Sequence, residues 1–193
     1  NLLKPSDGGL VAVPSQDMVL GLYYLTQERP GAKGEGKFFK SVNEAILAYE
    51  NGAVTLHSRI KVRMSKTMPD GKKITGIVES TLGRFIFNEI IPQDLGFVDR
   101  SIPGNELKLE VDFLVAKKQN KQILEKVINI HGATRTAEVL DAVKAMGYKY
   151  STRAAMTVSI SDMTEPPEKP QMIKDAQDTV DRITKQYKRG LIT

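Results

Sequence analysis

The sequence contains no cysteine and no tryptophan, and only two histidines, His57 and His131. Without cysteine the chain has neither a disulfide framework nor a cysteine-ligated zinc site. The histidines lie too far apart in the sequence to predict a local metal site. No apolar run approaches the roughly 20 residues that a membrane helix needs. We therefore expect a soluble, cytoplasmic protein with no membrane partner.

A large excess of charge of one sign is also absent. The 28 basic and 23 acidic residues give a net charge of +5, which suits an anionic partner but is too small for a dedicated nucleic-acid arm. With 193 residues, 40% of them hydrophobic, the chain can bury a real core. We expect one large domain, or one domain with an appendage.

Catalytic motifs are scarce. Gly31, Gly34 and Gly36 do not follow a strand with the spacing of a phosphate-binding loop. The Ser161-Asp162 pair is typical of a turn or helix cap, and the carboxylates near residues 164–170 fall in a proline-rich linker. We assign no catalytic residue and no metal ligand.

The stretch VAVPSQDMVLGLY (12–24) raises a question about Gln16. Residues 10–13 predict a short strand and residues 15–26 a helix. Ser15 can accept a hydrogen bond from a first-turn amide, and Asp17 suits the positive end of the helix dipole. Capping does not explain Gln16.

Residues 28–38 contain Pro30 and several glycines, which predicts a loop. A capping-box pattern begins at Ser41, and Asn51-Gly52 ends the helix that follows it. Apolar and polar residues alternate over 56–64, which is typical of a half-buried strand. A turn at 68–71 and a returning strand at 74–81 complete a predicted hairpin. Its basic outer row, His57, Arg59, Lys61 and Arg63, is either a solvated face or a surface that meets phosphates.

The next segments are predominantly helical in pattern. We expect Gly147 to end the second of two helices that are separated by a break at His131-Gly132. We expect a buried helix at residues 82–91, and these two helices at 120–130 and 136–146. An extended segment is expected at 156–160. The fold class is therefore α+β, with mixed helices and short antiparallel strands.

The C-terminal segment has a coiled-coil pattern, with apolar residues that step by three and four. No second heptad helix is present to receive them. The helix either dimerises, forms half of a helical hairpin, or packs on the body of the domain. Its apolar seam consists of Ile173, Ala176, Val180, Ile183 and Tyr187.

Four segments occur in this order along the chain: NLLKPSDGGLVAVPSQDMVLGLYYLT, AKGEGKFF, STLGRFIFNEIIP and GYKYSTRAAMTVSISDM. Together they resemble the largest (beta-prime) subunit of bacterial DNA-directed RNA polymerase. The resemblance implies that residues 1–154 form the pore domain of the secondary channel. Residues 155–193 are then the start of the funnel domain, with its first rim helix.

The resemblance also implies a transcription function. The full enzyme is a nucleotidyltransferase that binds DNA and synthesises RNA from ribonucleoside triphosphates. Its magnesium and zinc ligands lie outside this segment, so the segment itself holds no cofactor and is inactive alone. The implied partners are the other polymerase subunits, nucleotides that pass through the channel, and secondary-channel transcription factors, with DNA and RNA bound only in the full enzyme.

Several residues acquire expected roles from the resemblance. Gln16 and Arg153 are nucleotide-proximal; from the sequence alone, Arg153 is equally well explained as a surface arginine that ties a loop. A guanosine tetraphosphate site leaves a remnant at Asp141, but Thr134 replaces its lysine. The expected factor-docking residues are Lys185, Gln186, Tyr187, Lys188 and Arg189. The alternatives to a channel-lining module are an autonomous basic binding domain and an autonomous enzyme.

Overall fold

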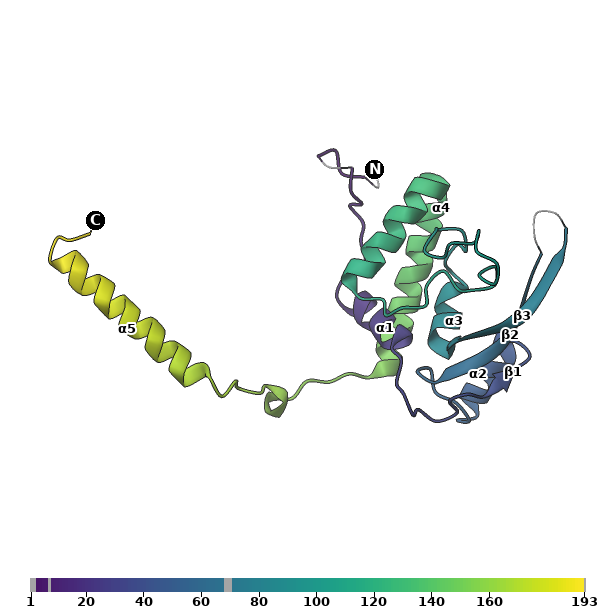
Figure 1. The fold of residues 1–193 in the computed structure, drawn as a ribbon, viewed down its shortest axis with the longest axis horizontal. Helices are drawn as coiled ribbons and strands as arrows, with labels where there is room; N and C mark the ends of the chain where they lie inside the picture. The colour runs from purple at the N-terminus through teal and green to yellow at the C-terminus, as the bar shows by residue number, and fades with distance from the viewer. Residues whose placement is uncertain (1–2, 7, 68–70, 193) are drawn as a thin grey trace. The chain divides into compact units, whose positions relative to one another are not determined.

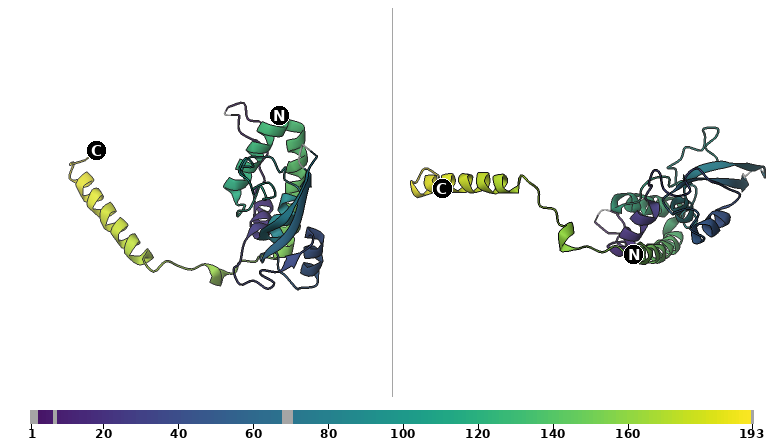
Figure 2. Two further views of the ribbon diagram at one scale, coloured as in Figure 1. Left: turned by 45° about the vertical axis from the view of Figure 1, so that its right-hand side comes forward. Right: turned by 90° about the horizontal axis from the view of Figure 1, so that it is seen from below.

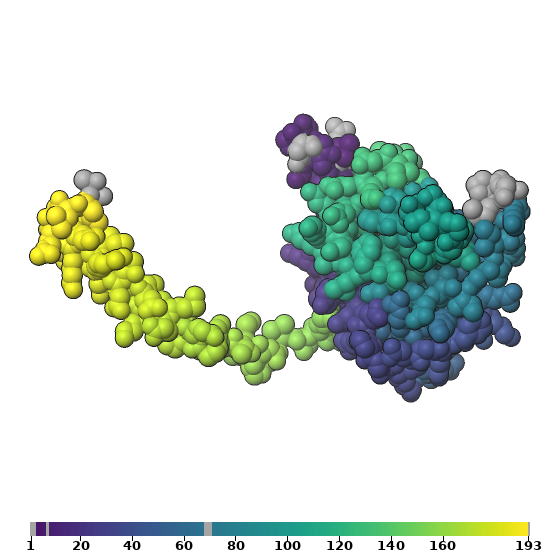
Figure 3. Space-filling view, in the orientation of Figure 1, coloured from purple at the N-terminus to yellow at the C-terminus, as the bar shows by residue number. Residues whose placement is uncertain are grey.

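The computed structural model describes residues 3–6, 8–67 and 71–192. The chain divides into two compact units, Asn1–Ala155 and Met156–Thr193 (Figures 1 and 3). The first unit combines helices with a small three-stranded sheet, which confirms the predicted α+β class. Among the described helices, none combines the length and the apolar character that crossing a bilayer requires.

The sheet has the order β1-β2-β3, with β1 (Phe38–Phe39) parallel to β2 (Arg59–Thr67) and β2 antiparallel to β3 (Lys73–Thr81). Burial alternates along both long strands, so one face packs on the core and the other is exposed. The hairpin is confirmed, although β2 begins three residues later than its predicted start at 56. The predicted turn at 68–71 lies largely outside the described residues.

Two short helices belong to this part of the chain, α2 after β1 and α3 after β3. Helix α2 (Val42–Glu50) is capped as predicted, since the Ser41 hydroxyl accepts a hydrogen bond from the Glu44 amide at 3.2 Å. Helix α3 (Leu82–Asn88) directly continues β3, and all seven of its residues are buried. Its buried character is confirmed, but the helix ends at Asn88 rather than at residue 91.

Helix α1 (Asp17–Thr26) packs against α4 (Lys117–Ala154), which consists of two arms that meet at Gly132. Gly132 has non-helical dihedrals, φ 73° and ψ −178°, so the predicted break is confirmed. Figure 1 shows the arms as teal and green ribbons. The core collects large apolar side chains from these elements, including Leu22, Leu25, Ile60, Phe85, Phe87, Ile123, Leu124 and Val143.

Glycines let α1 approach its two neighbouring helices closely. A Cβ atom on Gly21 would overlap the carbonyl oxygen of Gly147 in α4, and a Cβ on Gly147 would lie 2.6 Å from the Met18 carbonyl oxygen. A Cβ on Gly83 in α3 would overlap the Leu25 carbonyl oxygen. The prediction that Gly147 ends a helix is therefore wrong. This glycine lies inside α4, where the absence of a side chain permits the crossing.

Buried polar contacts hold the end of α1. The Arg84 guanidinium donates to the Thr26 carbonyl oxygen at 3.1 Å and pairs with Glu28 at 3.0 Å and Asp112 at 3.2 Å. Thr26 accepts a hydrogen bond from the Val115 amide at 2.9 Å. A buried charge costs free energy unless it is paired, and here Arg84 is paired on several sides. The network fixes α1, α3 and the segment before α4 together.

Beside this network the His57 imidazole is 5% exposed, and its Nδ1 lies 3.1 Å from the Gln27 carbonyl oxygen. The Tyr24 ring packs edge-on against it at 4.7 Å. Burial lowers the pKa of His57, with a smaller lowering from Arg29 and an opposing effect of the hydrogen bond to Gln27. His57 is therefore a core residue in the described structure and not part of the exposed basic row.

Three further expectations are wrong. Residues 10–13 form no strand, because only an isolated bridge joins Leu10 to Leu3. Residues 156–159 pair with no strand, and a short 3₁₀ helix occupies Ile160–Asp162. Ser15 does not cap α1 with its side chain, as the N-cap is Gln16 and makes no side-chain capping bond. The expected cap role of Asp162 is confirmed by its bond to the Ser159 amide at 2.8 Å.

In the second unit, α5 (Lys169–Lys188) contains all five residues of the predicted seam, and none of its residues is buried. Ile173, Val180, Ile183 and Tyr187 are each about half exposed or more, at 57, 54, 46 and 64%. The apolar seam is thus uncovered within its own unit. Figure 2 shows this helix as the yellow-green ribbon from two further sides.

We predict that Gly21→Ala lowers the free energy of unfolding by about 1–3 kcal/mol, because its methyl group must displace the Gly147 carbonyl in a packed crossing. Urea denaturation followed by circular dichroism measures the loss. Gly76→Ala is the matched control, since its methyl meets only the end of the Leu107 side chain, which can move. Equal losses of unfolding free energy in the two variants would show that the close approach of α1 and α4 is not what makes Gly21 sensitive.

Candidate functional site

The backbone at Gln16 has an unusual conformation, with φ 50° and ψ −124°. The Met18 amide donates to the Ser15 carbonyl oxygen at 3.2 Å, so residues 15–18 form a turn with Gln16 at a position that normally takes glycine. A side chain at such dihedrals costs about 1–3 kcal/mol. Gln16 is exposed, so its side chain does not recover this cost by packing. Retained strain of this kind is typical of functional positions.

Gln16 lines a surface cavity of about 320 Å³ between the start of α1 and the start of α4. Its polar groups are the Gln16 amide, the Ser15 hydroxyl, the Tyr23 phenol and the Lys117 ammonium. The start of α4 adds positive character, because its N-cap, Ala116, provides no side-chain capping bond. One cation and several neutral hydrogen-bonding groups suit a sugar or a single anionic group.

Arg153 lines a different cavity, of about 440 Å³, between α2, α3 and the second arm of α4. Its guanidinium lies 5.7 Å from the ring centroid of Tyr150 and, among the described residues, has no ion-pair partner. Burial raises the pKa of the Tyr150 phenol, an effect that the Arg153 charge partly opposes. Partial burial also raises the pKa of the Glu89 carboxyl in the same cavity. A guanidinium free to form new bonds can bind a carboxylate or phosphate.

The structure does not bring Gln16 and Arg153 into one cavity. The two cavities share no lining residue, since one is lined by the start of α1 and the start of α4 and the other by α2, α3 and the second arm of α4. Sequence reasoning missed Tyr23, Lys117, Glu89 and Tyr150. Tyr23 was detectable, because Gln16, Leu20 and Tyr23 follow helical spacing and fall on one face. The approach of Lys117 depends on the tertiary fold and leaves no local signal.

Asp141 and Thr134 are exposed positions on the second arm of α4. The Asp141 carboxylate lies 3.6 Å from the Lys144 ammonium, and its side chain is 80% exposed. Such a pair contributes little stability. Neither residue lines any of the described cavities with Gln16 or Arg153.

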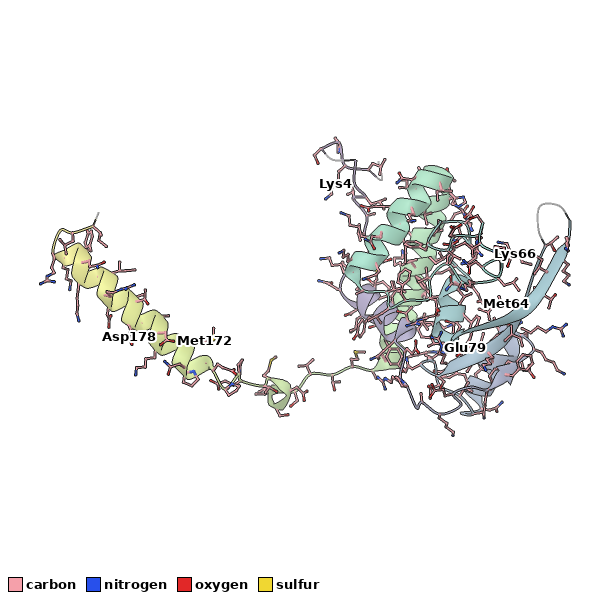
Figure 4. The ribbon with its side chains drawn as sticks, viewed as in Figure 1. Lys4, Met64, Lys66, Glu79, Met172 and Asp178 are labelled. Atoms are coloured by element: carbon pink, nitrogen blue, oxygen red, sulfur yellow. The ribbon has the colours of Figure 1, made fainter. Side chains whose placement is uncertain are left out.

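The expected docking residues lie at the end of α5, in the second unit, and all are exposed. Lys185 and Lys188 fall in the last helical turn, where cations interact favourably with the helix dipole. The residues of this group are Lys185, Gln186, Tyr187, Lys188 and Arg189. Figure 4 shows the side chains of this helix, with Met172 and Asp178 labelled.

Across residues 3–6, 8–67 and 71–192, no three acidic or histidine side chains converge as a group that can hold a metal ion. A family model described as RNA polymerase Rpb1, domain 3, matches residues 1–163 of the chain. This match covers the whole of the expected first domain and the first nine residues of the second. The chain belongs to the RNA polymerase beta' family.

Relatives of this beta' segment match it from end to end. It is 66% identical to DNA-directed RNA polymerase subunit beta' of Lachnoclostridium phytofermentans and 58% identical to that of Acetivibrio thermocellus, in each case over the whole chain. The subunit of Clostridium acetobutylicum is 55% identical. The beta' segment spans only 15 to 16% of the length of these relatives. The resemblance to the beta-prime subunit is confirmed.

We predict that Gln16→Gly stabilises the beta' segment by about 1 kcal/mol, because glycine adopts φ 50° without strain. The midpoint of urea denaturation measures the gain. Ser15→Gly is the control at a residue without positive φ, and it should be neutral or destabilising. A loss of stability in Gln16→Gly would show that the side chain, and not the backbone, dominates at this position.

Proposed function

We propose that the chain is a non-catalytic, channel-lining segment of DNA-directed RNA polymerase. In this proposal residues 1–154 form the pore domain of the secondary channel, through which ribonucleoside triphosphates enter. Residues 155–193 begin the funnel domain. The observation that carries the proposal is Gln16, a strained and exposed residue on a polar cavity that stability alone does not explain.

Gln16 and Arg153 act on the nucleotide at separate points of its path. The Gln16 amide offers a donor and an acceptor to sugar or base groups without adding charge. Arg153 offers a fork of donors that matches a phosphate, and no ion pair of Arg153 forms among the described residues, although the Glu50 and Glu89 side chains line the same cavity. Neither residue transfers a proton or forms a covalent bond, so both are binding residues. Catalysis belongs to other parts of the full subunit.

The α5 helix serves as the first rim helix and docks transcription factors. Its apolar seam is exposed within its own unit, whereas a seam spaced by three and four residues is satisfied by packing against a second helix. In the full subunit this second helix runs antiparallel to α5. The cationic end at Lys185, Lys188 and Arg189 then offers positive charge to an acidic factor.

For guanosine tetraphosphate, we propose only a weak interaction with this chain. Asp141 remains as the remnant of a guanosine tetraphosphate site, but the uncharged Thr134 supplies no cation for a phosphate. Asp141 pairs with Lys144 instead, at 3.6 Å. We propose that this remnant binds the alarmone weakly at best.

The test of nucleotide contact is Gln16→Ala in the fully assembled polymerase. Loss of one neutral hydrogen bond of about 0.5–1.5 kcal/mol predicts a rise in the KM for nucleotides of roughly two- to tenfold. The melting temperature of the segment should change little. Gln177→Ala, on α5, removes an amide that bonds only Asp181 and should leave KM unchanged. A lower melting temperature with normal nucleotide kinetics would make Gln16 structural.

A second prediction concerns the seam of α5. Amide hydrogen exchange around Val180 should be slower in the full-length subunit than in the 193-residue chain, because a lone helix of this length is marginal in water. Val180→Asp should abolish the difference, whereas Asp178→Ala, off the seam, should preserve it. Equal exchange rates in the two proteins would exclude a partner helix.

A further inference from the structure

The outer face of the sheet carries both apolar and cationic side chains. Phe38 is paired with Lys61, and Arg63 with Ile77, so these four side chains lie side by side across three strands. Phe38 is 51% exposed and Ile77 is 63% exposed. A strand face that only contacts water has no need of large apolar side chains. Phe38 and Ile77 are of residue types that usually pack against a neighbour.

Cations gather at one end of this face without counter-charges. Lys40, Arg63 and Lys73 line a shallow hollow of about 270 Å³, together with Ser65 and Thr75. Among the described residues, none of these cations, nor Lys61, has an ion-pair partner. Among the described strand residues of this face the one carboxylate is that of Glu79, which lies opposite Lys61 and is bonded to Arg59 at 3.2 Å. Glu28 and Asp112, from outside the strands, also pair with Arg59.

Three arginines of the first unit differ from this group. Arg59, Arg84 and Arg100 each pair with a carboxylate in the same unit. Lys40, Arg63 and Lys73 therefore retain the positive charge that pairing neutralises at these three arginines. Figure 4 locates the hairpin by Met64 and Lys66 on β2 and Glu79 on β3.

We propose that this outer face docks an acidic segment of another polymerase subunit, with its carboxylates in the hollow of Lys40, Arg63 and Lys73. The proposal rests on the proposed function, in which the chain is assembled with the other subunits. A protein segment fits better than a nucleic acid, because Phe38 and Ile77 can be buried against apolar side chains between the ion pairs. A phosphate backbone offers Ile77 no such contact.

The first experiment needs no substitution. The assembled polymerase is treated with a carbodiimide, which joins lysine amines directly to carboxylates in contact, and the products are mapped by mass spectrometry. Lys40, Lys61 or Lys73 should be joined to an aspartate or glutamate of another subunit. Acetylation of these lysines should also be several-fold slower in the assembled enzyme than in the free subunit.

The second experiment uses charge reversal in the full-length subunit. Arg63→Glu should weaken its incorporation into the polymerase about tenfold, and high salt should reduce the difference from the unmodified subunit. Ile77→Thr should weaken incorporation without this salt dependence. Lys118→Glu is the matched control, because Lys118 is an exposed helix cation that also has no ion-pair partner among the described residues. It should change incorporation by less than about twofold.

The outcomes separate the two proposals. Unchanged lysine reactivity on assembly, cross-links confined to this chain, or cross-links from this face to DNA or RNA would each overturn the docking proposal. Normal incorporation of Arg63→Glu would also overturn it and would leave the channel-lining function intact. Failure of the unmodified subunit to assemble with polymerase subunits at all would instead overturn the proposed function.

Discussion

The architecture of the first unit depends on how closely α1 approaches its two neighbouring helices. Backbone carbonyl oxygens of α1 and α4 occupy the space that side chains at Gly21 and Gly147 would fill, and Gly83 admits the Leu25 carbonyl in the same way. Close contact of this kind fixes the position and rotation of a helix more strictly than contact between flexible side chains does. The cavity of Gln16 is lined by α1 and the start of α4, so its shape depends on this close approach, whereas the cavity of Arg153 is lined by α2, α3 and the second arm of α4.

Buried hydrogen bonds also fix the position of α1, at its C-terminal end. Arg84 and Thr26 join this end to α3 and to the segment before α4, while Gln16 occupies a strained turn at the other end. The ends of the helix thus have opposite characters. One is stabilised by buried, paired groups, and the other holds an exposed amide at a cost in stability. This contrast favours a binding role for Gln16 over a structural one.

Much of this arrangement could be predicted from local pattern. The alternation in β2, the return of the chain as β3, the Ser41 cap and the break at Gly132 depend on neighbours in the sequence, and the sequence predicts each of them. The prediction for Gly147 is wrong because a glycine that ends a helix and a glycine at a helix crossing look alike in the sequence. The prediction for Ser15 is wrong because its backbone carbonyl, and not its hydroxyl, accepts the hydrogen bond at the start of α1. The lining residues Lys117 and Glu89 come from distant segments, so no local pattern contains them.

The connection between the two units has a mechanical consequence. Residues 156–159 belong to no helix or strand, and Ala155 before them leaves the helical path with φ 47°. A segment outside helices and strands bears tension along its covalent backbone but transmits bending and twisting poorly. Under the proposed docking role of α5, a bound protein is tethered by this segment rather than levered through it. Under the same proposal its effect would come from raised local concentration, which depends on the length of the tether.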